Sequence, residues 1–430
     1  MLYLGWLALL IGTGLYDMNK NIHCIHLYKG LRTDNGGKMT LCCKSNENLT
    51  DINGEEKLFH ETNMTNFIHG EKAKEIRTAL ENGIKHPNCS KCWSEEDSGI
   101  KSKRQHDIDN AIKFWGEKYT YDTEISPDIV EFNLGTVCNL KCRICGPWSS
   151  SFWNKEYKDL VRSPEYEEEG LTSEEQTKKY KKELAKYAGD WTEESLAWAN
   201  IDEHLSHLKK IDIFGGEPFL VEKQWKMLQK SVDNGWAHQQ RINFNTNGTQ
   251  YKDEYIEILS HFEGVFLSLS IDGIKEQFEY MRHPAKWDLL LCNIDKFKEA
   301  SKKYPNIDVN ICLTVNIQNA YDLPETVLFF KERGIHVYLN YCHWPLHYNV
   351  KHIPEHLKEK IYEKYSKVED EWVKKCCNDV EGLMRSQFSN KEHWDIFIKK
   401  IKDADEYRNE SFSKTFPAWS SLIGEFDENN

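Results

Sequence analysis

The sequence predicts an α/β fold organised as a partial (β/α)6 barrel of the TIM type. Six short runs rich in β-branched and aromatic residues alternate with helical segments between residues 125 and 345. This alternation is typical of βα units, whose strands pair in parallel. The chain has 430 residues, of which 12% are aromatic and 29% charged, so it is long and apolar enough for a folded barrel with further domains.

The barrel elements are expected in the following order. The predicted strands are Ile129–Leu134, Lys210–Phe214, Arg241–Asn245, Val265–Ile271, Asp308–Val315 and Ile335–Tyr341. The predicted helices are Glu222–Asn234, Asp253–His261, Trp287–Lys302 and Leu323–Arg333. The segment 148–208 between the first two strands is much longer than the roughly dozen residues that a crossover needs. Most of it is therefore a helical insertion, either a surface cap or a lid over the barrel mouth.

Three regions flank the barrel. Residues 1–20 form an apolar extension, residues 21–121 a small module, and residues 346–430 a helical tail that closes the barrel or contacts a partner. The module is expected to begin with two strands around a Thr33–Gly37 turn, whose Asn-Gly-Gly sequence is a strong hairpin signal. These strands are Asn21–Leu27 and Lys38–Cys43, followed by helices at Lys72–Asn82 and Lys103–Glu117; the tail helices are Glu355–Glu369 and Asp370–Arg385.

Charge and cysteine usage narrow the class of protein. The net charge of −13 argues against non-specific binding to nucleic acid or to anionic membranes. The thirteen cysteines include clusters at C-x3-C-x2-C and C-x2-C spacing, which favours metal ligation in a reducing compartment. Met1–Tyr16 is apolar but lacks basic residues and is short of the roughly 20 residues of a membrane span, so Met18 is a plausible start. We expect a cytoplasmic protein without a membrane partner.

The C-x3-C-x2-C loop consists of Cys138, Cys142 and Cys145, directly after the first barrel strand. Three thiolates can hold three irons of a cubane cluster and leave the fourth iron open, whereas most clusters have four protein thiolates. A zinc site and three core cysteines are the alternatives. A structural zinc ion usually takes four protein ligands, and this loop contains no fourth. The position after a barrel strand, where ligands bind, also favours a cluster.

Polar and glycine-rich sequences follow the other predicted strands. Gly215-Gly216-Glu217-Pro218 comes directly after the second strand, and its glycines allow backbone carbonyls to approach an ammonium group. By itself this sequence is a turn. Each small polar residue at the later strand ends is also more typical of a turn or cap, but together they form a ring around the barrel top. The ring consists of Asn245, Ser268, Ser270, Asp272 and Asn316.

These motifs together resemble the radical S-adenosylmethionine (SAM) superfamily, from Ile129 to about Tyr341. The resemblance implies a [4Fe–4S] cluster on Cys138, Cys142 and Cys145 whose open iron binds the methionine moiety of SAM. It further implies reductive cleavage of SAM to a 5′-deoxyadenosyl radical, which abstracts hydrogen from a substrate, with a flavodoxin- or ferredoxin-type electron donor. The implied SAM contacts are Gly215, Gly216, Glu217, Pro218, Asn245, Ser268, Ser270, Asp272, Asn316 and Ile144. Ile144 stands where the family usually has an aromatic residue.

The N-terminal module contains a second cysteine set: Cys24, Cys42 or Cys43, Cys89 and Cys92. It resembles the SPASM/twitch type of auxiliary Fe–S domain, here before the barrel instead of after it. The sequence from Glu96 to Arg104, E-x2-G-x2-S-x-R, resembles a pattern of such proteins. The resemblance implies a second [4Fe–4S] cluster, with Cys42 preferred over Cys43 because its spacing fits the domain's hairpin. A zinc ion on the same four thiolates is the alternative.

The remaining cysteines and histidines give weaker indications of a functional role. Cys292 and Cys312 are expected in the core, Cys342 in the core or facing substrate, and Cys376 and Cys377 in a tail helix without a role. His343, His347 and His352 are expected as polar residues at the barrel mouth. The resemblance makes a peptide or protein the first expectation for the substrate. A sugar, nucleotide or cofactor precursor is the enzymatic alternative, and a non-catalytic, metal-stabilised binding protein is the alternative from another class.

Overall fold

The computed structural model describes residues 22–97, 99, 101–162, 175, 178 and 191–426. The predicted extension 1–20 and the middle of the insertion 148–208 lie outside these residues. By compactness the chain divides into two units. The first comprises Met1–Leu31, Met39–Lys57 and Met64–Pro127, and the second comprises Arg32–Lys38, Leu58–Asn63 and Asp128–Asn430.

The second unit is built on a parallel sheet, as the sequence predicts. Its strands are β3 (Ile129–Asn133), β4 (Lys210–Phe214), β5 (Arg241–Thr246), β6 (Gly264–Ser270), β7 (Ile307–Val315) and β8 (His336–Tyr341). They lie in sequence order, and each pairs in parallel with the next. The carboxyl ends of all the strands therefore meet at one edge of the sheet, where the predicted site residues stand.

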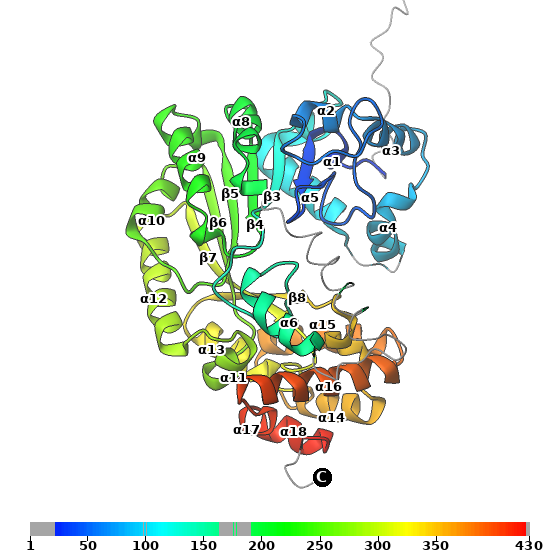
Figure 1. Cartoon of the computed structure of the whole chain (residues 1–430), viewed down its shortest axis with the longest axis vertical. Coiled ribbons are helices and arrows are strands. Elements are labelled where there is room, and N and C mark those ends of the chain that lie inside the picture. Colours follow the sequence, from blue (N-terminus) through cyan, green and yellow to red (C-terminus); the bar gives the residue numbers. More distant parts are fainter. Residues whose placement is uncertain are drawn as a thin grey trace, which may run out of the picture. The chain divides into compact units, whose positions relative to one another are not determined.

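Helices cover one side of these strands (Figure 1). They are α9 (Glu222–Asp233), α10 (Asp253–Leu259), α11 (Lys275–Met281), α12 (Trp287–Lys303) and α13 (Leu323–Glu332). Alternate strand residues such as Ile211, Ile242 and Leu267 are fully buried, as expected where a sheet face packs on helices. The predicted strands and helices agree with these bounds within two residues. The short helix α11 was not predicted.

The tail is helical, as predicted, and contains α14 (Glu355–Tyr365), α15 (Glu371–Arg385), α16 (Lys391–Arg408), α17 (Phe412–Thr415) and α18 (Pro417–Ile423). The start of the predicted insertion forms η2 (Ser151–Trp153) and α6 (Asn154–Arg162), and its end forms η4 (Trp191–Glu193) and α8 (Ser195–His204). Within the ranges that the structure describes, no helix is both long enough and apolar enough to span a bilayer.

The first unit is mainly helical. It contains α1 (His26–Lys29), β2 (Met39–Thr40), α2 (Met64–Ile68), α3 (Glu71–Glu81), η1 (Pro87–Cys89), α4 (Ser90–Asp97) and α5 (Lys103–Thr120). Strand β1 (Gly30–Thr33) runs from this unit into the second. The predicted Thr33–Gly37 turn is confirmed, because the Asp34 amide donates to the carbonyl of Lys38 at 2.8 Å.

The strand predicted at Asn21–Leu27 is wrong. Its described residues form a loop and the start of helix α1, and the strand begins only at Gly30. The side chains of His23 and His26 instead bond the carbonyl of Thr120 and the carboxylate of Asp107 on α5, at 2.8 and 2.7 Å. These contacts to a helix about 80 to 100 residues away favour a compact turn over the extended chain that local propensity suggested.

Candidate active site

The three-cysteine loop directly follows β3 and is held at two points by backbone hydrogen bonds. The amides of Lys141 and Arg143 each donate, at 2.8 Å, to the carbonyls of His283 and Met281 at the end of α11. Within the loop the Cys145 amide donates to the carbonyl of Cys142 at 2.9 Å. The loop is therefore fixed against the segment that follows β6.

The thiols of this loop lie close enough to influence one another. Burial raises the pKa of Cys138 to about 12, and the neighbouring Cys142 adds to this. Burial also raises the pKa of Cys145, followed by the charges of Cys142 and Cys138. The three thiols are thus close neighbours and partly buried, and a metal centre that binds them as thiolates must displace their protons. This chemistry fits the cluster that the spacing predicts.

A single metal ion needs a tighter arrangement. Ligands of one zinc ion lie about 2.3 Å from it, so their sulfurs stand within about 4 Å of each other. Among the residues that the structure describes, no group of three or more His, Cys, Asp or Glu side chains has such an arrangement. In a cubane cluster each thiolate binds its own iron, and the three sulfurs are correspondingly farther apart.

The two glycines after β4 are required by the backbone of the cysteine loop. A Cβ on Gly216 would lie 2.1 Å from the carbonyl oxygen of Val137, and one on Gly215 would lie 2.3 Å from the amide of Leu134. Gly215 also has a φ of +97°, which L-residues rarely adopt. The amides of Gly216 and Glu217 donate to the carbonyls of Gly135 and Val137, at 3.1 and 2.7 Å. The Gly-Gly sequence thus braces the loop that carries Cys138.

Glu217 is 1% exposed, and its carboxylate connects the loops after β4 and β5. It accepts hydrogen bonds from the Phe219 amide at 2.9 Å, the Thr246 hydroxyl at 2.7 Å and the Asn247 amide at 2.7 Å. Burial raises the pKa of Glu217, and these hydrogen bonds oppose the rise. The sequence predicts Glu217 as a cofactor contact, and in the structure its side chain joins these two loops.

The loop after β5 in turn reaches the cysteine loop, and the sequence alone did not single out this contact. Asn139, next to Cys138, accepts a hydrogen bond from the Asn247 side chain and donates one to the Thr249 hydroxyl, both at 2.9 Å. Asn247 and Thr249 belong to the Asn-Thr-Asn-Gly-Thr sequence that follows β5. One side-chain amide and one hydroxyl thus fix Asn139, the residue beside the first cysteine.

A buried ion pair stands beside Cys142. The guanidinium of Arg282 lies 2.8 Å from the carboxylate of Asp272, and its other terminal nitrogen lies 3.9 Å from the Cys142 sulfur. Asp272 also accepts a hydrogen bond from the Thr314 amide at 3.0 Å, which joins the ends of β6 and β7. The charge of Arg282 opposes the rise that burial causes in the pKa of Cys142. The sequence predicts Asp272 as a site residue. It does not single out Arg282, which lies ten residues after Asp272.

The other predicted strand-end residues also make local contacts. The buried Asn316 bonds its own loop, accepting from the Gln318 amide at 2.9 Å and donating to the Thr314 carbonyl at 3.0 Å. Burial raises the pKa of Tyr338 on β8, and the neighbouring Ser268 and Asn245 oppose the rise. The sequence did not single out Tyr338. Ser270, Pro218 and Ile144 complete the predicted set; Pro218 is buried, and the other two are partly exposed.

The predicted cysteine set of the first unit also comes together. Burial raises the pKa of Cys24 strongly, and the charges of Cys42, Cys89 and Cys92 add to the rise. Cys43 is exposed, whereas Cys42 is partly buried. The buried Asn88 accepts hydrogen bonds from the amides of Asn46 and Glu47, at 2.9 and 2.8 Å, and so holds the two parts of the set together.

The E-x2-G-x2-S-x-R pattern forms a buried lock beside these cysteines. Arg104 bonds both carboxylate oxygens of Glu96, at 2.9 and 2.7 Å, and a third donor reaches the carbonyl of His23 at 2.6 Å. The hydroxyl of Ser102 also donates to Glu96, at 2.5 Å. Arg104 thus connects α4, which carries Cys92, to the segment that carries Cys24. A bidentate arginine–carboxylate pair is both strong and directional.

The remaining cysteines and histidines differ in their burial. Cys312, Cys342, Cys376 and Cys377 are buried, but the prediction that Cys292 lies in the core is wrong, because it is exposed on α12. Helical periodicity places it beside the apolar stripe and not within it. His343 is exposed, whereas the buried His352 packs on His393 of α16, with ring centroids 4.5 Å apart. His352 is therefore part of the tail's packing, contrary to its prediction as a residue of the barrel mouth.

Comparison with known proteins agrees with the site. Residues 132–330 match the sequence model of the Radical SAM superfamily. A stretch of 118 residues is 30% identical to the sporulation killing factor maturation protein SkfB of Bacillus subtilis (strain 168), and covers 27% of each protein. The match therefore spans about a quarter of that relative.

Two solved structures are also similar at low identity. SuiB of Streptococcus suis, bound to precursor peptide SuiA, is 15% identical over 69% of this chain and 59% of its own, with a TM-score of 0.32. Native anSMEcpe, with bound AdoMet and Kp18Cys peptide, is 19% identical over 55% of this chain and 61% of its own, with a TM-score of 0.33. The matched residues contain the cysteine loop after β3 and the parallel strands β4 to β7. The chain therefore carries a domain of the Radical SAM superfamily at residues 132–330.

Proposed function

We propose that this protein is a radical SAM enzyme that modifies a peptide. The observation that carries the proposal is the convergence of three neighbouring, partly buried thiols on a loop that the Gly-Gly backbone, Asn139 and Arg282 fix in place. Cys138, Cys142 and Cys145 would hold a [4Fe–4S] cluster. Bound there, the cluster supplies one electron for the reductive cleavage of SAM to a 5′-deoxyadenosyl radical, which takes hydrogen from the substrate.

The surrounding residues position and shield this centre. Arg282 places a buried positive charge beside the Cys142 sulfur, which favours a thiolate there. Glu217 holds the ends of β4 and β5 together, so that the carbonyls of the Gly-Gly-Glu-Pro turn keep their direction. We further propose that Gly215, Gly216 and the polar residues Asn245, Ser268, Ser270 and Asn316 face SAM. An electron donor of the flavodoxin or ferredoxin type belongs to this proposal.

We also propose a second [4Fe–4S] cluster in the first unit, on Cys24, Cys42, Cys89 and Cys92. The electrostatic coupling among these four thiols supports this set, and the exposure of Cys43 favours Cys42. Four protein thiolates would leave no open iron, so this centre would carry electrons or anchor substrate instead of binding SAM.

The test is anaerobic purification, reconstitution with iron and sulfide, and addition of dithionite and SAM. We expect 5′-deoxyadenosine as the product. Cys138→Ala should abolish cleavage, whereas Cys89→Ala should remove roughly half of the iron and leave some cleavage, because four of the eight irons of two such clusters belong to each site. A protein that binds zinc instead of iron and forms no 5′-deoxyadenosine would refute the proposal.

A peptide is proposed as substrate because the relative SkfB is named as a maturation protein for a killing factor. The test is to co-express the chain with short peptides encoded beside it and to compare their masses with and without the enzyme. A mass change that requires Cys138 supports the peptide class. Cleavage of SAM that is stimulated by a sugar or nucleotide, and by none of these peptides, would contradict it.

A further inference from the structure

Two cationic residues of the cysteine loop, Lys141 and Arg143, flank Cys142 and are held by the helical tail. The tail lies beyond residue 330, where the family match ends. Its contacts to the loop come from the last turn of α16 and the residue pair that follows it. The inference drawn from these contacts rests on the proposed function of the loop.

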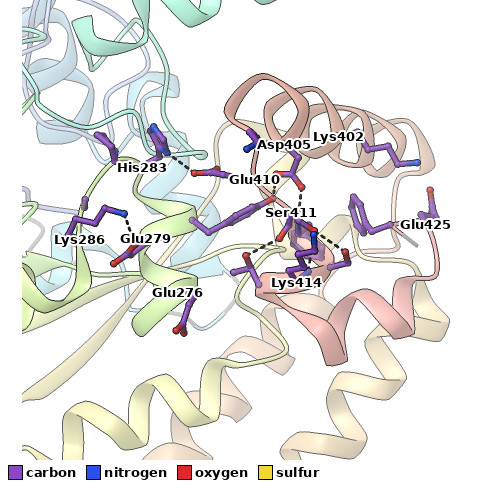
Figure 2. A pocket seen from close by; sticks show the side chains of 18 residues that line it. Glu276, Glu279, His283, Lys286, Lys402, Asp405, Glu410, Ser411, Lys414 and Glu425 are labelled. Atoms are coloured by element: carbon purple, nitrogen blue, oxygen red, sulfur yellow. Dashed lines mark hydrogen bonds and ion pairs between the residues drawn. The ribbon is translucent and has the colours of Figure 1, made fainter. Parts of the chain in front are cut away.

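Arg143 reaches the tail through a buried guanidinium. One of its nitrogens lies 2.5 Å from the carboxylate of Asp405 and 2.6 Å from that of Glu410. The same guanidinium stacks on the ring of Tyr280, 3.5 Å from its centroid. Figure 2 shows His283 directed toward Glu410, and the two atoms that pair lie 2.6 Å apart. Two carboxylates from the tail thus bind the Arg143 guanidinium of the cysteine loop, and Glu410 also bonds the imidazole of His283 after α11.

Lys141 reaches the tail through a second ionic group. Its ammonium lies 2.6 Å from the carboxylate of Glu156 on α6, and its carbonyl accepts a hydrogen bond from Arg408 at 2.9 Å. Arg408 also binds Glu156, at 2.9 and 3.1 Å, and both of these side chains are 1% exposed. The neighbouring Trp153 donates a hydrogen bond to the carbonyl of Cys142 itself, at 3.2 Å.

Buried charges of this kind are held in fixed positions. Removing one partner of a buried ion pair leaves an uncompensated charge and typically destabilises by about 3–5 kcal/mol, although the intact pair adds little net stability over an apolar contact. Such groups therefore restrict conformation more than they stabilise the fold. Here they fix the main chain on both sides of Cys142.

We propose that the C-terminal region, together with Glu156 of α6, acts as a clamp on the cysteine loop, in which Arg408, Glu156, Asp405 and Glu410 are positioning residues for the cluster ligands. The clamp consists of the Arg408–Glu156–Lys141 group and the Asp405/Glu410–Arg143 group. By holding Lys141 and Arg143, it sets the direction of the Cys142 thiol between them. The tail is thus part of the active site, although none of its side chains is a ligand.

A cavity of about 870 Å³ borders the clamp on its outer side and is lined by Asp405, Glu410, Tyr280 and His283 (Figure 2). The two carboxylates are therefore 15% and 20% exposed, whereas the side chain of Arg143 is 1% exposed. The Asp405 and Glu410 carboxylates lie between Arg143 and this hollow. Loss of a clamp residue should therefore both loosen the loop and admit solvent to it.

The test compares Arg408→Met, Arg408→Lys and Glu156→Gln in a full-length chain that also carries Cys89→Ala, so that the loop holds the cluster measured. The readouts are bound iron, the electron paramagnetic resonance spectrum of the reduced cluster and its change on adding SAM. Arg408→Met and Glu156→Gln should lower the rate of SAM cleavage by about 10-fold or more, as outer-shell changes at metal sites do. Both variants should also broaden the spectrum. Arg408→Lys should keep part of the parent's cleavage rate and part of its narrower spectrum.

Arg385→Met is the matched control, because Arg385 pairs with Glu381 at 2.8 Å on the exposed face of α15. It should leave the spectrum and the cleavage rate unchanged. Circular dichroism establishes which variants are folded. If Arg408→Met does not fold, the milder Arg408→Lys replaces it in the comparison. A folded Arg408→Met protein with the spectrum and rate of its parent would overturn the clamp. A parent chain that forms no cluster at all would instead overturn the proposed function.

Discussion

Gly216→Ala tests whether the Gly-Gly sequence is a brace for the cysteine loop. The added methyl group would lie 2.1 Å from the carbonyl oxygen of Val137 and 2.7 Å from its carbon, and both are main-chain atoms that cannot rotate away. Ordinary contact begins at about 3.4 Å, so one backbone must move by about 1.3 Å.

A movement of this size breaks the two hydrogen bonds that join the turn to the loop, from the amides of Gly216 and Glu217. Each is worth about 1 kcal/mol, and overpacking adds about 1–3 kcal/mol. The expected loss of unfolding free energy is therefore about 4 kcal/mol. With a slope of about 3 kcal/mol per molar urea, the unfolding midpoint should fall by more than about 1 M.

The assay is urea unfolding of the iron-free protein, followed by iron binding and SAM cleavage after reconstitution. Gly382→Ala is the matched control, because Gly382 lies inside α15 and its added Cβ would have no neighbour within 4 Å. This substitution should stabilise by up to about 1 kcal/mol through helix propensity. If Gly216→Ala unfolds at the same urea concentration as the parent and binds iron normally, the brace has no role.

The remaining predictions concern single contacts. Cys42→Ser should lose the iron of the first unit and Cys43→Ser should keep it, as measured by iron content; the opposite result would exchange the two assignments. Arg104→Met should also lower that iron content, because the pairing with Glu96 and the bond to the His23 carbonyl are lost together, whereas equal iron in variant and parent would contradict this. Glu217→Gln should destabilise by about 2 kcal/mol in urea unfolding, since one acceptor oxygen becomes an amide group that faces a donor, and an unchanged midpoint would refute this. Burial, followed by the charge of His393, lowers the pKa of His352 to about 4 from an ordinary value of 6.5. The unfolded chain therefore takes up this proton first, so stability should fall by up to about 3 kcal/mol as the pH falls from 6.5 to 4. His352→Phe should show a shallower decline over this range in thermal unfolding, and a decline as steep as that of the parent would refute the assignment.

The barrel elements could be predicted because each carries its own local signal. Runs such as Lys210–Phe214 combine β-branched residues with a following Gly-Gly turn, and their bounds were correct within two residues. The strand expected at Asn21–Leu27 failed because the histidines there bond distant partners on α5 and its C-terminal end, which local propensity does not include. Cys292 was misplaced for a related reason, since a residue beside an apolar stripe can face either way until its neighbours are known.

The sequence by itself determined which residues are the proposed cluster ligands: the spacing of Cys138, Cys142 and Cys145, and the glycines that follow the next strand, are patterns that neighbouring residues carry. Only the tertiary structure decided what holds these residues in place. Arg282, Asn247, Glu156 and Arg408 lie between about 10 and 270 residues from the cysteines that they support. No periodicity relates them to the loop, because a buried charge is fixed by whichever partner the fold brings within hydrogen-bond distance.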